Sequence, residues 1–366
     1  MRKNNFLFVL GCPSMFLTQT TYSTVGGSSP LSVAADDVNG DGKPDIVVAN
    51  NGADNVGVLL NRGNGSFLAQ ITYTTGGGSS PYAVALEDVN GDGKPDIVVA
   101  NDGNDNVGVL LNRGNGTFLP QTTYTTGSNS APFSVSLGDV NGDGKPDMAV
   151  ANSGTNTVGV LLNLGNGTFL PQITYAAGTN PRAVTLADVN GDNILDIVVA
   201  NNNANTVGVF LNRGNGTFLA QTAYTTGGGS STRAVTVGDV NGDNALDIVV
   251  ANNAGNTVGV FLNRGNGTFL AQTAYTTGGG SNPRSVALTD VNGDNRLDII
   301  VANDGTDNVG VLINRGNGTF LAQASLPALT NSGPRSIAVA DVNGDNEADI
   351  VVANNGGDTA GVFLGC

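Results

Sequence analysis

The chain has 366 residues, 54 of them glycine, and carries a formal net charge of −15 with no histidine and no tryptophan. Such an acidic chain does not suit a phosphate backbone, which argues against nucleic acid as a partner. Without histidine, the commonest general base and zinc ligand are missing, which excludes most familiar hydrolase chemistry. No apolar run approaches the roughly 18 residues of a spanning helix, so we expect no membrane span.

The sequence is a tandem repeat, and its period decides the expected architecture. A fixed period of about 50 residues is typical of solenoids, propellers and arrays, and it overrides the two or three domains that length alone would suggest. The phrase Asp-Val-Asn-Gly-Asp recurs at intervals of 49 or 51 residues, beginning at Asp37, Asp88, Asp139, Asp188, Asp239, Asp290 and Asp341.

One unit, residues 80–127, predicts four short strands, at 82–89, 96–101, 106–111 and 117–124. The second is a continuous apolar run of the kind expected for a buried strand, and clusters of Gly, Asn, Asp and Ser separate all four. No segment has the apolar period of a helix. We therefore predict an all-β fold, a seven-bladed β-propeller with four antiparallel strands per blade. The alternative is a linear β-array, which would leave two sheet edges unprotected.

The two ends of the chain complement each other. The last unit stops after its third strand, near Leu364, whereas residues 16–22 match the fourth strand of the first unit, residues 67–73. The N-terminal strand is therefore expected to complete the last blade and close the ring. This divides the chain into an N-terminal lead, residues 1–15, with only a weak export signal, and one propeller, residues 16–366.

The Asp-rich loop of each unit has the donors of a cation site. In the loop 37–45, side-chain oxygens stand at positions 1, 3, 5 and 9, and position 7 offers its backbone carbonyl. Position 6 is Gly or Asn, the residues that most readily adopt a left-handed conformation. Oxygen donors without nitrogen or sulfur select a hard cation, and a flexible loop suits Ca²⁺ better than Mg²⁺. The alternative is an Asx turn that only caps a hairpin.

The charge count favours the cation. The aspartates at positions 1, 5 and 9 of the seven loops make up 21 of the 30 acidic residues, and seven Ca²⁺ ions would bring the net charge from −15 to about −1. We therefore predict about seven Ca²⁺ sites. Their predicted ligands are Asp37, Asn39, Asp41, Lys43, Asp45, Asp88, Asn90, Asp92, Lys94, Asp96, Asp139, Asn141, Asp143, Lys145, Asp147, Asp188, Asn190, Asp192, Ile194, Asp196, Asp239, Asn241, Asp243, Ala245, Asp247, Asp290, Asn292, Asp294, Arg296, Asp298, Asp341, Asn343, Asp345, Glu347 and Asp349.

These residues resemble a known family. An Asp-x-Asn-x-Asp-Gly-x-x-Asp loop between the first two strands of a β-unit of about 50 residues is similar to the FG-GAP/VCBS repeat. That repeat builds the seven-bladed, calcium-binding propellers of integrin α subunits and of integrin-like fungal lectins. The resemblance covers residues 16–364, although the Phe-Gly and Gly-Ala-Pro elements that name the family are degenerate here. It implies adhesion or carbohydrate binding and identifies no ligand.

Strand alternation sorts the loops onto two faces. The Asp-rich loops share one face with the turns between third and fourth strands, which contain Asn-Gly-Ser/Thr sequons at Asn64, Asn115, Asn166, Asn215, Asn266 and Asn317. These sequons predict either glycosylation or simple turn chemistry. The opposite face is the predicted binding face, because one position before the innermost strand varies there. It is Leu31 in the first unit, and the predicted ligand-binding residues are Tyr82, Phe133, Arg182, Arg233, Arg284 and Arg335.

The predicted function is a calcium-stabilised, extracellular or cell-surface module that binds a glycan or protein, with a monomer as the expected state. The alternative is a structural or assembly element of a surface layer or matrix, without a small ligand. We predict no enzyme activity, because a base would have to be Lys, Tyr, Arg or a carboxylate. The two cysteines, Cys12 and Cys366, lie beside the expected chain break in the last blade. They are predicted to form a disulfide that replaces the missing covalent turn.

Overall fold

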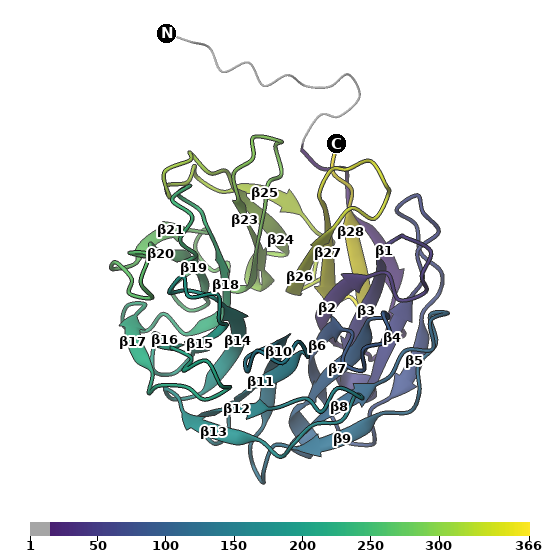
Figure 1. Ribbon diagram of the computed structural model, residues 1–366. Coiled ribbons are helices and arrows are strands. Elements are labelled where there is room, and N and C mark those ends of the chain that lie inside the picture. The colour runs from purple at the N-terminus through teal and green to yellow at the C-terminus, as the bar shows by residue number, and fades with distance from the viewer. Residues whose placement is uncertain (1–14) are drawn as a thin grey trace.

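The structure, a computed structural model, describes residues 15–366 and shows seven four-stranded sheets arranged around a central axis (Figure 1). Each sheet is antiparallel, and six of the seven are built from consecutive strands, while the seventh combines the last three strands with the N-terminal one; this confirms the predicted seven-bladed β-propeller. Three short 3₁₀ turns, η1 (Asn51–Ala53), η2 (Asp102–Asn104) and η3 (Asp304–Thr306), follow second strands. Among residues 15–366 we find no helix that could span a membrane.

The strands fall into four sets by their distance from the axis. The innermost are β2 (Pro30–Asp36), β6 (Pro81–Glu87), β10 (Pro132–Gly138), β14 (Pro181–Ala187), β18 (Thr232–Gly238), β22 (Pro283–Thr289) and β26 (Pro334–Ala340). The second strands are β3 (Asp45–Asn50), β7 (Asp96–Asn101), β11 (Asp147–Asn152), β15 (Asp196–Asn201), β19 (Asp247–Asn252), β23 (Asp298–Asn303) and β27 (Asp349–Asn354).

The two outer sets complete each blade. The third strands are β4 (Asn55–Leu59), β8 (Asn106–Leu110), β12 (Thr157–Leu161), β16 (Thr206–Phe210), β20 (Thr257–Phe261), β24 (Asn308–Leu312) and β28 (Thr359–Phe363). The outermost are β5 (Ile71–Thr74), β9 (Thr122–Thr125), β13 (Ile173–Ala176), β17 (Thr222–Thr225), β21 (Thr273–Thr276), β25 (Ala324–Pro327) and β1 (Thr20–Ser23).

The hydrophobic core lies between neighbouring blades. The second strand of each blade is buried along its whole length, because its two faces pack against the sheets on either side. This is why its sequence is a continuous apolar run instead of an alternating one. Each of the apolar clusters joins residues of two adjacent blades, such as Ile300 and Val311 of one with Ile337 and Ile350 of the next.

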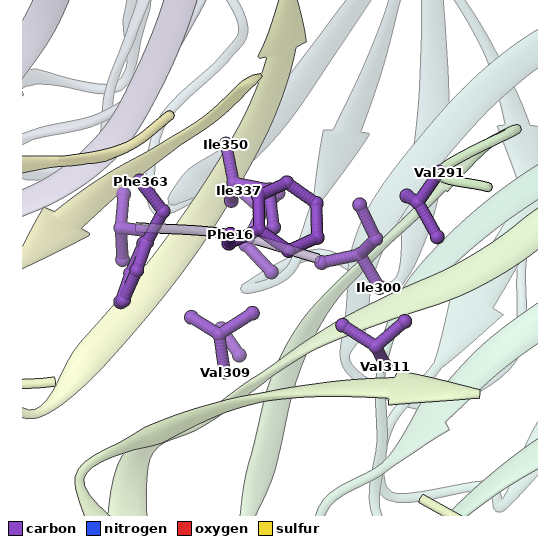
Figure 2. Packing of buried hydrophobic residues seen from close by; sticks show 10 residues of the cluster. Phe16, Val291, Ile300, Val309, Val311, Ile337, Ile350 and Phe363 are labelled. Atoms are coloured by element: carbon purple, nitrogen blue, oxygen red, sulfur yellow. The ribbon is translucent and has the colours of Figure 1, made fainter. Parts of the chain in front are cut away.

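The N-terminal strand closes the ring, as predicted. β1 pairs antiparallel with β28, with Thr20 opposite Val362 and Ser23 opposite Thr359. Before β1, Phe16 forms a bridge with Gly365 and is buried in the apolar cluster between the last two blades. Figure 2 shows Phe16 among Ile337, Ile350 and Phe363. The two ends of the propeller therefore share one sheet and one core cluster.

The fourth strand is shorter than predicted. The sequence predicted a strand over residues 117–124, whereas the structure has an isolated bridge at Phe118 and then β9. The interruption lies at Gln121, whose Nε2 donates to Thr75 O of the preceding link and whose Oε1 accepts from Asn101 Nδ2 at 3.4 Å. This side chain lies over Gly108, where an added Cβ would meet Oε1 at 2.0 Å. The strand breaks because its glutamine turns inward.

Candidate functional site

The seven variable residues predicted at the axis all lie at the same structural position. Each is the second residue of an innermost strand, where the register with the second strand shifts. Such a β-bulge redirects a side chain and is common beside binding sites. We call these residues the axial ring: Leu31, Tyr82, Phe133, Arg182, Arg233, Arg284 and Arg335.

The segment that connects one blade to the next, and leads into the bulge, is fixed by hydrogen bonds. In the first blade, Asp54 accepts hydrogen bonds from the amides of Gly78 and Ser80, both at 2.8 Å. The Ser80 amide bond is the main reason that the pKa of Asp54 lies below its ordinary value. Ser80 has a left-handed backbone, with φ of 45°, a conformation that costs a non-glycine residue about 1 kcal/mol or more. The link therefore fixes where the strand begins and where Tyr82 points.

One side of the axial ring is aromatic. Tyr82 and Phe133 come from neighbouring blades, and their ring centroids are 4.1 Å apart. The guanidinium carbon of Arg182 lies 4.1 Å from the Phe133 centroid, and Arg182 Nε donates to Asn180 Oδ1 at 2.9 Å. Phe133 is therefore covered by its two neighbours, whereas Tyr82 faces the axis.

The other side of the ring is cationic. Arg284 Nη2 lies 2.9 Å from Asp304 Oδ2, and Arg335 Nε lies 3.0 Å from Asp304 Oδ1, so one carboxylate serves two guanidinium groups. Arg233 lies between Arg182 and Arg284 in the ring, and its Nε is buried without a hydrogen-bond partner in residues 15–366. Burial, together with the charges of Arg284 and Arg182, lowers the pKa of Arg233 to about 10.

The axial ring surrounds a hollow. Leu31, Tyr82 and the four arginines line it, while the covered Phe133 does not. Its empty volume is about 340 Å³, part of which is open to solvent. The part of it that a water-sized group can occupy is about 50 Å³, so the hollow admits a small charged group such as a carboxylate and not a whole sugar ring. The structure thus brings together five of the six predicted ligand-binding residues around one space.

The Asp-rich loops lie at the other end of the innermost strands. In the first loop, Asp37 Oδ1 accepts the amide of Gly40 at 2.7 Å, and Oδ2 accepts that of Gly42 at 2.6 Å. Asn39 Oδ1 accepts the amide of Asp41 at 2.9 Å, and Asp41 Oδ2 lies 3.7 Å from Lys43 Nζ. The loop is therefore wound around the carboxylate at position 1, and the carboxylate at position 5 has a lysine partner.

The ninth position is buried below each loop. Asp45 accepts hydrogen bonds from the amides of Val38 at 3.1 Å and Asn61 at 2.7 Å. Burial is the main cause that raises the pKa of Asp45 to about 6, although these two amides lower it, and the carboxylates of Asp41 and Asp37 raise it further. The three carboxylates of one loop are thus close enough to influence one another.

The loop carboxylates do not converge on a single point. Over residues 15–366, no group of three or more Asp, Glu, Cys or His side chains is placed to hold a metal ion. The donor set has the hard oxygen atoms that Ca²⁺ requires, but Asp37 and Asp45 direct their oxygens at backbone amides. The same pattern recurs in the other loops, including Asp139 with Gly142 and Gly144.

Sequence reasoning missed a buried asparagine that ties the blades together. Asn112 Nδ2 donates to Pro95 O of its own blade at 2.8 Å and to Val38 O of the preceding blade at 3.0 Å. The equivalent residues are Asn61, Asn163, Asn212, Asn263 and Asn314. The recurring Leu-Asn-Arg-Gly phrase was the available signal, and it resembled an ordinary turn.

Two further predictions concern the turns on the loop face. The sequon asparagines accept hydrogen bonds within their own turns, as when Asn115 Oδ1 accepts from Thr117 Oγ1 at 2.6 Å. In the last blade, the amide of Cys366 donates to Met15 O at 3.2 Å, and Cys366 is disulfide-bonded. Its predicted partner, Cys12, lies outside the described residues, so the pairing stays a prediction.

Comparison with known proteins gives the family. The family model described as FG-GAP-like repeat matches residues 37–99, 88–150, 139–199, 188–250, 239–301 and 290–352. No curated protein sequence matches the chain.

Two solved structures share the fold. A virginiamycin B lyase from Staphylococcus aureus is 14% identical, with a TM-score of 0.69 over 95% of this chain and 99% of that chain. An Agrocybe aegerita lectin that recognises non-reducing terminal N-acetylglucosamine is 24% identical, with a TM-score of 0.60 over 89% of this chain and 86% of that chain. At these identities the similarity establishes the fold alone, and this fold is shared by an enzyme and a lectin.

Proposed function

We propose that this chain, which belongs to the FG-GAP repeat family, is a calcium-stabilised module that binds a glycan or a protein at the axial hollow. One observation carries the proposal: units that otherwise repeat closely differ at the axial ring, and there they gather Tyr82 and four arginines around one hollow. Concave sites that combine an aromatic face with a few polar groups are typical of ligand recognition. The lectin with the same fold is consistent with this function.

Calcium is the cation that the loops would hold. Each loop offers carboxylate, amide and carbonyl oxygens and no nitrogen or sulfur donor, which suits Ca²⁺. Burial, and then the like charges of Asp41 and Asp37, raise the pKa of Asp45, and a cation between these carboxylates would offset that repulsion. Binding would require Asp37 and Asp45 to turn oxygens from backbone amides toward the cation. Asp41 would exchange its surface ion pair with Lys43 for the cation, a small loss because exposed pairs contribute little.

An extracellular or cell-surface location follows from this chemistry. Loops built from few carboxylates bind Ca²⁺ weakly and fill where the ion is abundant, which is outside cells. A disulfide linking the chain ends would persist in the same compartment. We therefore expect the partner to be a glycan or an extracellular protein, and the closed ring to act as a monomer.

A second candidate is an assembly element of a surface layer or matrix. The observation that favours it is the exposed outer rim, where Ile71 of β5 and Ile173 of β13 are 45% and 50% exposed. Outermost strands present unpaired backbone groups that a second copy can pair with. Catalysis is less well supported, because the chain has no histidine and the hollow offers Tyr82 as its one weakly acidic side chain.

A glycan array, run with Ca²⁺ and with EGTA, tests the proposal. We expect binding with Ca²⁺, its loss with EGTA, and its loss in Tyr82→Ala without a large change in melting temperature. Ile71→Ala, on the outer rim, is the matched control and should bind normally. Concentration-dependent assembly without any ligand would favour the second candidate. A ligand held between neighbouring loops, near Asp188 and Asp243, would contradict the assignment to the axial face.

A further inference from the structure

The axial hollow has more positive charge than its own carboxylates can balance. Four arginines line it, and the ion pairs in residues 15–366 give them one carboxylate, Asp304, which Arg284 and Arg335 share. Arg182 lies on the Phe133 ring and donates to the neutral side chain of Asn180. This cationic cluster stands in a chain with a net charge of −15, so it does not follow from overall composition.

Arg233 is the least satisfied member of the cluster. Its Nε is buried without a hydrogen-bond partner among the described residues, and it is flanked by two other arginines. A guanidinium group stays protonated at neutral pH and cannot relieve this cost by losing its proton. Arg233 is partly buried, and holding such a charge beside two like charges without a counter-charge is unfavourable. The arrangement is therefore one that an anion in the hollow would stabilise.

One further carboxylate, that of Asp102, interacts with the cluster and does not change this balance. Asp102, at the start of η2, has a buried Oδ1 without a partner in the described part of the chain. Burial raises the pKa of Asp102, while the charge of Arg182 lowers it. Asp102 forms no ion pair with Arg182 within the described residues. It reduces the positive field on the aromatic side of the ring and leaves Arg233 unbalanced.

The wall opposite the arginines is apolar. Leu31 and Tyr82 line it, and they follow Arg335 in ring order, so the hollow has one cationic and one apolar side. An aromatic face stacks on the C–H face of a sugar ring, and a planar guanidinium fork matches a carboxylate or sulfate. About 50 Å³ of the hollow is open to a water-sized group, which is room for the charged group alone, so the sugar ring would lie at the mouth of the hollow.

Resting on the proposed binding function, we propose that the axial hollow recognises a single acidic sugar unit. Its carboxylate or sulfate group would meet Arg233 and its neighbours, and its ring would lie against Tyr82. Arg233 would supply the selectivity for charge, because its Nε has no other partner to satisfy it. The four bulges hold the arginines where the innermost strands begin, so the site needs little reorganisation to accept the anion.

Calorimetric titration of the whole protein in Ca²⁺ tests this inference. The probes are glucuronate, glucose 6-sulfate, glucose, inorganic sulfate and a short Asp-rich peptide. We expect at least one acidic sugar to bind about tenfold or more tightly than glucose, because charge-assisted hydrogen bonds exceed neutral ones. Arg233→Gln should abolish this preference, while Arg264→Gln, an exposed arginine on the loop face, should keep it. Without ligand, Arg233→Gln should melt no lower than the parent protein, because it removes a partly buried charge that has no counter-charge.

The outcomes separate this inference from the proposed function. Equal affinity for glucose and the acidic sugars, or an unchanged preference in Arg233→Gln, would overturn the inference. So would binding of inorganic sulfate or the Asp-rich peptide as tight as that of the acidic sugars, because the sugar ring would then contribute nothing. Neutral glycans that bind and are lost in Tyr82→Ala would support the proposed function while contradicting the acidic ligand. Failure of every probe here and in the glycan array would reject both.

Discussion

Removing Ca²⁺ should reverse the pH dependence of the protein's stability. Each blade buries one aspartate at the ninth position of its loop. Burial, and then the carboxylates at positions 5 and 1, raise the pKa of this aspartate to about 6, although two backbone amides offset part of the effect. The residues concerned are Asp45, Asp96, Asp147, Asp196, Asp247, Asp298 and Asp349.

The sign follows from the raised pKa. The folded state holds the proton more tightly than the unfolded chain, where an aspartate titrates near 3.8. Its stabilisation is complete below that value and is lost as the pH rises through about 6. Raising the pKa of this buried aspartate from 3.8 to about 6 corresponds to about 3 kcal/mol at each site. A bound cation requires deprotonated carboxylates, so Ca²⁺ should turn the same pH rise into a gain in stability.

Differential scanning calorimetry across about pH 5 to 8 measures both effects. With EGTA, the melting temperature should rise as the pH falls toward 5, by several degrees for each few kcal/mol recovered. With Ca²⁺, it should fall over the same range. Asp139 and Asp341 do not confuse the result. Burial raises the pKa of each, but hydrogen bonds from the loop amides lower it by more. Both pKa values therefore lie below 3.8, outside this pH window.

Two results would refute this reasoning. If the melting curves with EGTA and with Ca²⁺ coincide at every pH, the loops are not metal sites. If stability with EGTA instead rises with pH between about 4 and 6, the buried aspartates are not destabilised by their charge. In that case the amide hydrogen bonds to the ninth position outweigh burial, and the loops are complete without a cation.

Three further predictions concern the stability of the propeller. Asn163→Ala leaves two carbonyls of adjacent blades without a buried donor, so it should reduce the free energy of unfolding, measured by urea titration, by about 2 kcal/mol or more. An unchanged urea midpoint would contradict the bridging role. Gly103→Ala places a Cβ 2.1 Å from a backbone oxygen and should destabilise by about 1 to 3 kcal/mol, whereas Gly77→Ala has open space and should be neutral. Peptide mapping without reduction should recover Cys12 linked to Cys366, and free thiols at both positions would reject the pairing.

The sequence predicts those elements whose structure is specified by their own residues. The second strand of the second unit was predicted at 96–101 and is found there as β7. A short continuous apolar run between polar residues is typical of a strand buried on both faces. Closure of the ring was predictable because residues 16–22 repeat the outermost strand that the last unit lacks. In both cases the information lies within one segment of the chain.

Features that depend on contacts between units were not predictable in the same way. The break before β9 arises because Gln121 reaches a carbonyl of the preceding link, and the blade-bridging role of Asn112 depends on Val38 of the preceding blade. At the axis, sequence alone identified the variable position and its residue types. It did not show that Arg182 covers Phe133 or that Asp304 serves two arginines, because those contacts exist only once seven units meet.

The order of residues around the axial ring makes the two sides of the hollow chemically different. Neighbouring blades place their axial residues side by side, so an alternating order would mix aromatic and cationic groups evenly around the hollow. Instead, Leu31, Tyr82 and Phe133 are consecutive, and the four arginines follow. The hollow therefore has one apolar and one positively charged side, although the blades that build it are nearly the same. A hollow with two unlike sides suits a ligand that has an apolar face and a charged group. An acidic sugar therefore fits better than an anion alone.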